Sequence, residues 1–263
     1  MKKPSPAVAT VVSSSAVTPN MQRILLQSDK FADYPSDCEG GYVKLLFNKE
    51  GGTKLPKIMG GRPVMRTYTI RSFDPAASTI EIDFVRHVSD SHSNLEVEGG
   101  FASHWAETAK QGDSISVAGP GLIQGLKKDA DWFFLVADMT ALPAMSVKLK
   151  NLRADAQGYA VVEVASKEDI QSIEHPEGIE VEWVIKPQNE ASSLHENVLK
   201  KKWLDGVVSI WCACEFDSMK ALRQYFRNEK EVDKDSIYIS SYWKDGVTED
   251  GHKIIKSQDA QAQ

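Results

Sequence analysis

Cysteine is scarce in this chain, and its pattern argues against a disulfide framework. The 263 residues include only Cys38, Cys212 and Cys214. An odd number of cysteines without a repeated spacing is not typical of a disulfide-rich secreted protein. Cys212 and Cys214 have no second Cys or His pair that would complete a zinc site, and the run that begins at Val207 is apolar. We therefore expect them to be small, buried thiols in a core strand.

Long apolar segments and an excess of basic charge are also missing. No uninterrupted apolar run is long enough to span a bilayer. The short N-terminal apolar run is broken by Ser13, Ser14 and Ser15, so it does not form the core of a signal peptide. The formal net charge is −6, and no cationic amphipathic stretch is present. We therefore expect no nucleic-acid partner, no membrane association and a cytoplasmic location.

Several catalytic signatures are absent as well. The sequence shows no paired carboxylates, no nucleophile elbow and no metal-ligand cluster, so hydrolysis has no candidate machinery. The loop from Asp138 to Ala144, which joins a strand to a helix, is not a Gly-x-Gly-x-x-Gly loop. A pyridine-nucleotide site in this chain must therefore be of another kind. Because ligands of open α/β sheets bind at the carboxyl ends of the strands, this loop is expected to face the cleft between two domains.

The first half of the chain is rich in predicted strands separated by turns. The strands are expected at Met21–Leu26, Tyr42–Phe47, Arg66–Arg71, Thr79–Val85 and Ser114–Val117. One helix is predicted from Phe101 to Lys110. Several short strands with glycine- and proline-containing turns indicate an antiparallel barrel or sandwich.

From about Asp131 onward, strands alternate with helices. Strands are predicted at Trp132–Ala137, Tyr159–Val164, Ile179–Ile185, Val207–Cys212 and Ile237–Tyr242, and helices after Thr140, at Ser193–Trp203 and at Asp217–Lys230. This alternation indicates a parallel α/β sheet. Thr140 is expected to cap its helix, with Pro143 near the start. The predicted division is a domain at 1–124, a second at 125–243, and a polar segment at 244–263 that forms a tail or a lid.

The stretch from Met65 to Arg71 carries the clearest pattern for a ligand. Its alternation predicts a strand in which Arg66, Tyr68 and Ile70 share one face. Such a strand could hold a flavin nucleotide, with the arginine on the pyrophosphate, the tyrosine over the ring and Thr69 near the reactive nitrogen. The same alternation also occurs on solvated edge strands.

Two further segments fit the same ligand. The run from Asp83 to His87 could be the hairpin partner of the Arg66 strand, and its end either contacts the flavin or is simply solvated. Gly99 and Gly100 open a helix that contains Ser103. Two glycines before free helix N–H groups allow a phosphate to approach closely, although a plain turn would look alike.

Taken in order, these pieces resemble the siderophore-interacting protein family. These proteins are FAD-dependent ferric-siderophore reductases of the broader ferredoxin–NADP reductase-like group. The matching pieces are Arg66–Thr69, Asp83–His87, Gly100–Ala106, Gly112–Asp113, Val117–Pro120, Asp138–Ala144, Trp211–Glu215 and Ser241–Gly246. Three positions depart from the usual family pattern: Phe101 replaces Pro, Met139 replaces Glu, and Cys214 replaces Gly. A glycine at this position would let a nicotinamide or a substrate approach closely, so with Cys214 the resemblance does not establish where the reductant binds.

The resemblance implies a mixed β and α/β fold. An N-terminal antiparallel flavin-binding β-barrel of the six-stranded type would be followed by a C-terminal Rossmann-like α/β domain of the NAD(P)H-binding kind. The residues implied to bind FAD are Arg66, Thr67, Tyr68, Thr69, Asp83, Phe84, Val85, His87, Gly99, Gly100, Ala102, Ser103, Trp105 and Thr140.

The implied activity is reduction of a ferric siderophore. Hard oxygen ligands prefer Fe(III) to Fe(II), so one electron would loosen the iron and release it. The donor would be NADH, NADPH or a ferredoxin, and the sequence leaves this choice open. Lysines on a basic rim would attract an anionic siderophore; the candidates are Lys44, Lys127, Lys128, Lys244 and Lys253. The alternatives are a ferredoxin/flavin–NAD(P) reductase and a non-enzymatic siderophore-binding carrier.

Overall fold

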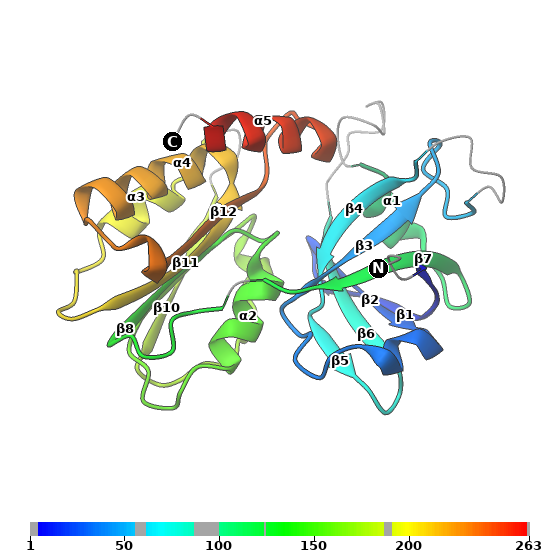
Figure 1. Ribbon diagram of the computed structural model, residues 1–263, viewed down its shortest axis with the longest axis horizontal. Helices are drawn as coiled ribbons and strands as arrows, with labels where there is room; N and C mark the ends of the chain where they lie inside the picture. Colours follow the sequence, from blue (N-terminus) through cyan, green and yellow to red (C-terminus); the bar gives the residue numbers. More distant parts are fainter. Residues whose placement is uncertain (1–4, 56–61, 87–99, 124, 187–190, 262–263) are drawn as a thin grey trace. The chain divides into compact units, whose positions relative to one another are not determined.

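The N-terminal half of the chain folds as an antiparallel sheet and the C-terminal half as a parallel one (Figure 1). The computed structural model describes residues 5–55, 62–86, 100–123, 125–186 and 191–261. The chain divides into two units, Met1–Ile123 and Gln124–Gln263. Each unit has its own core.

In the N-terminal unit, seven strands pair in the order β4-β3-β7-β1-β2-β6-β5. Their bounds are β1 Ala7–Thr18, β2 Met21–Gln27, β3 Tyr42–Phe47, β4 Val64–Thr69, β5 Ser72–Asp74, β6 Thr79–Val85 and β7 Ser114–Gly121. The chain passes directly from β4 at one end of this order to β5 at the other, and the backbone N–H of Arg71 donates to the carbonyl of Glu81 in β6 at 2.8 Å. The sheet therefore curls back on itself, as in a barrel.

The sequence did not predict β1 or β5. In β1, the residues that face the core are small, among them Ala7, Ala9 and Val11, and the second half of the strand is mostly serine and alanine. Such a strand gives almost no contrast between apolar and polar positions, which is the signal that sequence analysis uses. β5 has three residues, too few to show a period.

Helix α1, Gly100–Thr108, is fixed to the sheet by aromatic contacts. The ring centroid of Trp105 lies 6.4 Å from that of Phe47 and 5.9 Å from that of Phe84, both in edge-on geometry. This geometry is favourable for aromatic pairs. The helix is thereby held against β3 and β6.

In the C-terminal unit, five parallel strands pair in the order β10-β9-β8-β11-β12. The strands are β8 Trp132–Ala137, β9 Gly158–Val164, β10 Ile179–Ile185, β11 Val208–Glu215 and β12 Ile237–Trp243; the α-helices are α2 Leu142–Lys150, α3 Leu194–Leu199, α4 Phe216–Gln224 and α5 Glu249–Gln261. Short turns of other helix types are η1 Asp29–Asp33 in the N-terminal unit and η2 Lys167–Asp169, the π-helix η3 Tyr225–Glu229 and η4 Lys234–Ser236 here.

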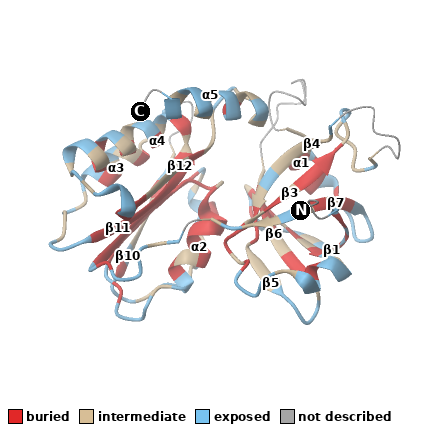
Figure 2. Ribbon diagram, viewed as in Figure 1, coloured by how far each residue is buried: buried red, intermediate tan, exposed pale blue. Residues whose placement is uncertain are grey.

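Helices cover both faces of the parallel sheet, with α2 on one face and α3 and α4 on the other (Figure 1). As expected for strands covered on both faces, β8 and β9 are buried at every position. The inner strand β11 is buried at all but its last position, and it is drawn mostly in red in Figure 2. Among the described residues, no helix is long and apolar enough to cross a membrane.

Three details differ from the sequence-based predictions. Helix α2 begins at Leu142, and no side chain caps it at Ala141, so the prediction that Thr140 is the cap is wrong. Helix α3 is shorter than predicted. The helix predicted from Asp217 to Lys230 ends as a π-turn, in which the N–H of Lys230 donates to the carbonyl of Tyr225 at 2.9 Å.

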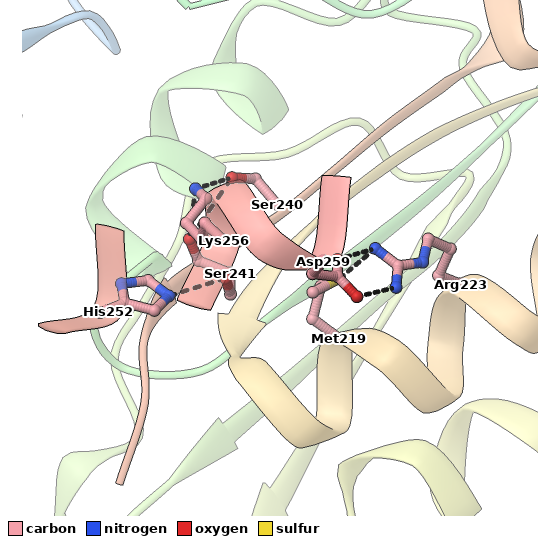
Figure 3. A network of polar contacts seen from close by, with 7 residues as sticks. All are labelled: Met219, Arg223, Ser240, Ser241, His252, Lys256 and Asp259. Atoms are coloured by element: carbon pink, nitrogen blue, oxygen red, sulfur yellow. Dashed lines mark hydrogen bonds and ion pairs between the residues drawn. The ribbon is translucent and has the colours of Figure 1, made fainter. Parts of the chain in front are cut away.

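The segment after β12 contains helix α5, which polar bonds hold onto β12 and α4 (Figure 3). Arg223 of α4 binds Asp259 through two hydrogen bonds of 2.6 and 2.8 Å. Lys256 Nζ donates to Ser240 Oγ and to the carbonyl of Ser241, each at 2.9 Å. The helix is mostly polar, so its sequence lacks an apolar stripe that would predict it.

A buried histidine completes this network. Nε2 of His252 lies 2.8 Å from Oγ of Ser241, and the residue is 4% exposed. Burial first, and then the nearby Lys256 ammonium, lower the pKa of His252 to about 4, and Glu249, Lys244 and Lys253 add smaller effects of both signs. The neutral imidazole is therefore the form that the folded protein keeps at neutral pH.

Acid is expected to destabilise the fold through His252. Between its folded-state pKa of about 4 and the value of about 6.5 in an unfolded chain, only the unfolded chain takes up the proton. The free energy of unfolding should fall between about pH 7 and about pH 4, by on the order of 1–3 kcal/mol more than in the His252→Gln variant. Chemical denaturation of both proteins across this range measures the difference, and parallel pH profiles would contradict the prediction.

Candidate functional site

In the N-terminal unit, β4 presents Arg66 and Tyr68 on one face, as predicted. Their partners in β3 are Leu45 and Val43, both fully buried. Because directly paired residues of a sheet share a face, Arg66 and Tyr68 extend from the side of the sheet that carries the core. Ile70 is also buried, but it lies just beyond the end of β4.

Tyr68 is held in place by the aromatic core beneath it. Its ring centroid lies 4.3 Å from that of Phe84, which in turn packs against Trp105. Phe84 is fully buried and Trp105 nearly so, whereas Tyr68 is half-buried. Next to it in the strand, Thr69 is buried and Thr67 is exposed. The tyrosine ring therefore lies at the boundary between core and surface, where a ring-shaped ligand can reach it.

The guanidinium of Arg66 lies beside the start of helix α1. A Cβ atom placed on Gly100 would be 4.0 Å from Nε of Arg66, and the φ angle of Gly100 is +66°. Among the described residues, no carboxylate forms an ion pair with Arg66. The first N–H groups of an α-helix have no partner within the helix, and its dipole favours negative charge. The structure thus places a cation next to a helix start, and this combination suits a phosphate.

The first turn of α1 fits a phosphate group closely approaching the backbone. Gly100 has no Cβ, and Ala102 and Ser103 are small and buried. The Ser103 hydroxyl donates to the carbonyl of Val85 at the end of β6, at 3.1 Å. This bond fixes the helix start against the strand, so the backbone N–H groups rather than the hydroxyl are the groups available to an anion.

Asp83 has a partner inside the unit. Its carboxylate accepts hydrogen bonds from Nε and Nη2 of Arg23 at 2.6 and 2.8 Å, and it is 8% exposed. The two residues are paired across β2 and β6. Because neighbouring residues of a strand point to opposite faces, Asp83 lies on the face of β6 opposite to Phe84, and the structure does not bring it together with Arg66 and Tyr68. Phe84, which packs against Trp105, is the residue that supports Tyr68. His87 and Gly99, which the sequence also assigns to FAD, lie outside the described residues.

In the C-terminal unit, the loop from β8 to α2 is organised by a buried carboxylate. Oδ1 of Asp138 accepts hydrogen bonds from the N–H of Thr140 at 2.9 Å, from its hydroxyl at 2.6 Å and from the N–H of Ala141 at 3.3 Å. Oδ2 accepts from the indole Nε1 of Trp243 at 2.7 Å, which ties the end of β12 to this loop. Burial raises the pKa of Asp138, and these hydrogen bonds oppose the rise.

The role of Asp138 explains why Thr140 is not the helix cap. Its hydroxyl is directed toward the aspartate, to which it donates, and no backbone N–H at the start of α2 donates to a capping side chain. No role for Asp138 was predicted from the sequence. An Asp that directly follows a buried strand and precedes a helix is the signal that could have identified it, because Asp favours such turns.

The cysteines of β11 are buried, as predicted. Cys212 and Cys214 are fully buried and are not joined by a disulfide bond, and Cys38 is likewise a buried free thiol. The hydrogen bond with Cys212, followed by burial, raises the pKa of Cys214 well above its usual value. The Cys214 side chain is therefore a protonated thiol at neutral pH, and not a reactive thiolate.

Of the five predicted rim lysines, three have no ion pair among the described residues. Lys44 of β3 pairs with Thr67 and lies on the opposite face of the sheet from Arg66. The structure therefore does not bring it together with the arginine. Lys127 and Lys128 are exposed in the segment before β8.

The other two lysines are neutralised by neighbouring acids. Lys244 lies 2.8 Å from a carboxylate oxygen of Asp217. Lys253 of α5 lies 3.2 Å from Glu249 and 3.1 Å from Asp250. Such exposed pairs contribute little to stability, but they reduce the charge that a distant anion experiences.

Comparison with known proteins matches both halves of the chain. Residues 10–123 match the siderophore-interacting FAD-binding domain, and residues 130–246 match the siderophore-interacting protein family. The ferric vibriobactin reductase ViuB of Vibrio cholerae is 30% identical over 259 residues, which cover 94% of this chain and 92% of ViuB. The crystal structure of the siderophore-interacting protein SipS from Aeromonas hydrophila aligns with a TM-score of 0.81 at 31% identity, over 96% of this chain and 98% of SipS.

A more distant likeness concerns the fold alone. The ferredoxin-NADP+ reductase of Plasmodium falciparum aligns with a TM-score of 0.65 at 12% identity, over 90% of this chain and 96% of the reductase. The comparisons confirm the predicted fold class, with seven strands in the first sheet where six were implied. They also confirm FAD as the predicted cofactor.

Proposed function

The chain belongs to the siderophore-interacting protein family, and from this membership we propose that it reduces the Fe(III) of a ferric siderophore and releases Fe(II). Family membership makes it an FAD-binding oxidoreductase. The observation that carries the proposal is the position of Arg66 beside the start of α1, next to Tyr68, inside the segment that matches the FAD-binding domain.

The residues present suit FAD. Arg66 and the first backbone N–H groups of α1 would hold the diphosphate, because the guanidinium and the positive end of the helix dipole lie next to each other. Tyr68 would lie against the flavin ring, with Thr69 beside it. Bound FAD supplies the redox chemistry, since flavins accept electrons in pairs and donate them singly.

The iron itself requires no ligand from the protein. Siderophores bind iron through hard donor atoms that favour Fe(III), so reduction weakens the chelate and frees the metal. The protein has to bind the chelate and exclude other electron acceptors. We propose NADH, NADPH or a ferredoxin as the donor, and a cytoplasmic location, which agrees with three free, buried cysteines.

The proposal is tested by following iron release. Purified protein with FAD is mixed anaerobically with a ferric hydroxamate or a ferric catecholate, an electron donor and a chromogenic Fe(II) trap. Iron release above that of the FAD-free protein supports the proposal. Rapid reduction of ferredoxin or free flavin, with no iron release above this control, would instead indicate a general reductase.

Removing the charges of Lys127 and Lys128 is expected to weaken substrate binding. Both lysines are exposed and have no ion pair among the described residues, so they can attract an anionic siderophore. In the K127Q/K128Q variant, KM for an anionic ferric siderophore should rise about threefold with little change in kcat, and added salt should narrow the difference.

The matched control for this test is K244Q/K253Q, which also removes two positive charges. These ammonium groups are already paired with acidic side chains, so their loss should change KM less. Equal effects of the two double variants, or no effect of either, would show that the exposed pair does not guide the substrate.

A further inference from the structure

The ring of Phe101, the second residue of α1, lies among three groups. Its centroid is 6.5 Å from the ring centroid of Phe47 in β3. Cζ of Arg66 lies 5.9 Å from the same centroid. On a third side is Gly51, where an added Cβ would lie only 2.4 Å from Cδ1 of the phenylalanine. The ring therefore fills the space between the turn after β3 and the guanidinium.

The turn that supports the ring is itself well braced. Oδ1 of Asn48 accepts hydrogen bonds from the N–H of Gly52 at 2.7 Å and of Glu50 at 3.0 Å. Its Nδ2 donates to the carbonyl of Lys54 at 3.2 Å. Gly51 adopts a φ of +82°, in the region that favours glycine, and it lacks the side chain that would displace the ring. This turn is therefore a well-ordered surface against which the Phe101 ring packs.

Among the described residues, the only hydrogen bond of the Arg66 side chain is a local one. Its Nη1 donates to the carbonyl of the preceding residue, Met65, at 3.1 Å. No carboxylate of the described part of the chain pairs with it. A long arginine side chain loses considerable rotamer freedom when a ligand fixes it, and a partner that restricts it beforehand reduces this cost. An aromatic ring within about 6 Å of a guanidinium attracts it and does not compete for its hydrogen bonds.

We propose that Phe101, seated on the Gly51 turn, is a positioning residue that holds the Arg66 guanidinium at the start of α1, ready for the diphosphate of FAD. The inference rests on the proposed role of Arg66 in the FAD site. The side chain of Phe101 makes no hydrogen bond to the anion and acts only through the arginine.

The test is a double-mutant cycle on FAD affinity in the full-length protein. FAD is removed, and its dissociation constant is measured by flavin fluorescence for the wild type, F101L, R66A and the double variant. F101L should weaken binding about fivefold, a loss consistent with a cation–π contact and its ordering effect. In the R66A background, F101L should have no further effect. The separate variant F101Y keeps an aromatic ring, and its affinity for FAD should be within about twofold of that of the wild type.

The outcomes separate this inference from the function on which it rests. If R66A leaves the affinity unchanged, the proposed role of Arg66 fails. If R66A weakens binding but F101L causes the same loss with and without Arg66, or F101Y binds no better than F101L, the positioning role of Phe101 is refuted. Thermal melting of the FAD-free forms identifies variants that do not fold. If F101L is one of them, Gly51→Ala, which displaces the ring and leaves it intact, replaces it in the same cycle.

Discussion

Arg66→Ala is expected to weaken FAD binding by roughly 10- to 100-fold, because hydrogen bonds between a guanidinium and a diphosphate are charge-assisted. The arginine lies beside the start of α1 and has no acidic partner among the described residues, so its charge is available to a ligand. The fold should be hardly affected, since the side chain is only half-buried. Titration of the FAD-free protein with FAD measures the loss, and thermal melting without FAD measures the stability.

Arg62→Ala is the matched control for this substitution. Arg62 is exposed and lies four residues earlier, so its removal changes the net charge by the same amount. Its effect on FAD affinity should stay within about twofold, as expected for a charge that acts only at long range in salt. A similar loss for both variants would mean that Arg66 acts through the general field of the protein. Unchanged affinity in Arg66→Ala would remove the diphosphate role.

The sequence predicted the local arrangement of β4 and of the start of α1 because the relevant signals are local. Alternation along β4 put Arg66 and Tyr68 on one face, and the glycine at position 100 indicated where α1 begins. The juxtaposition of β4 with that helix start depends on the curl of the whole sheet. The sequence could suggest it only through the family resemblance.

The sequence could not show which side chains from distant parts of the chain pair with each other in the fold. Asp83 appears on a strand next to other implied FAD residues, but its carboxylate binds Arg23 on the neighbouring strand. The register of β2 and β6 decides this pairing, and no local pattern encodes it. Helix α5 is a similar case, because a bidentate ion pair between Asp259 and Arg223 holds it, where an apolar stripe would have been visible.

The bond between Asp138 and Trp243 joins positions 105 residues apart and was also beyond local patterns. It closes the loop in which Thr140 lies, and it couples the end of β12 to the end of β8. The shape of this loop therefore depends on the C-terminal strand as well as on its own sequence.

Asp138→Ala is expected to lower the free energy of unfolding by about 3 kcal/mol, because it leaves several buried donors without an acceptor. The donors are two backbone N–H groups, the hydroxyl of Thr140 and the indole of Trp243. Asp138→Asn keeps the shape of the side chain, but its amide can place an N–H opposite the indole N–H of Trp243. The indole then loses its acceptor. Removing the indole donor with Trp243→Phe should then cost less in the D138N background than in the wild type. Chemical denaturation of D138A measures the first loss. The same measurement on the wild type, D138N, W243F and the double variant gives the coupling, and additive losses would show that the two side chains do not depend on each other.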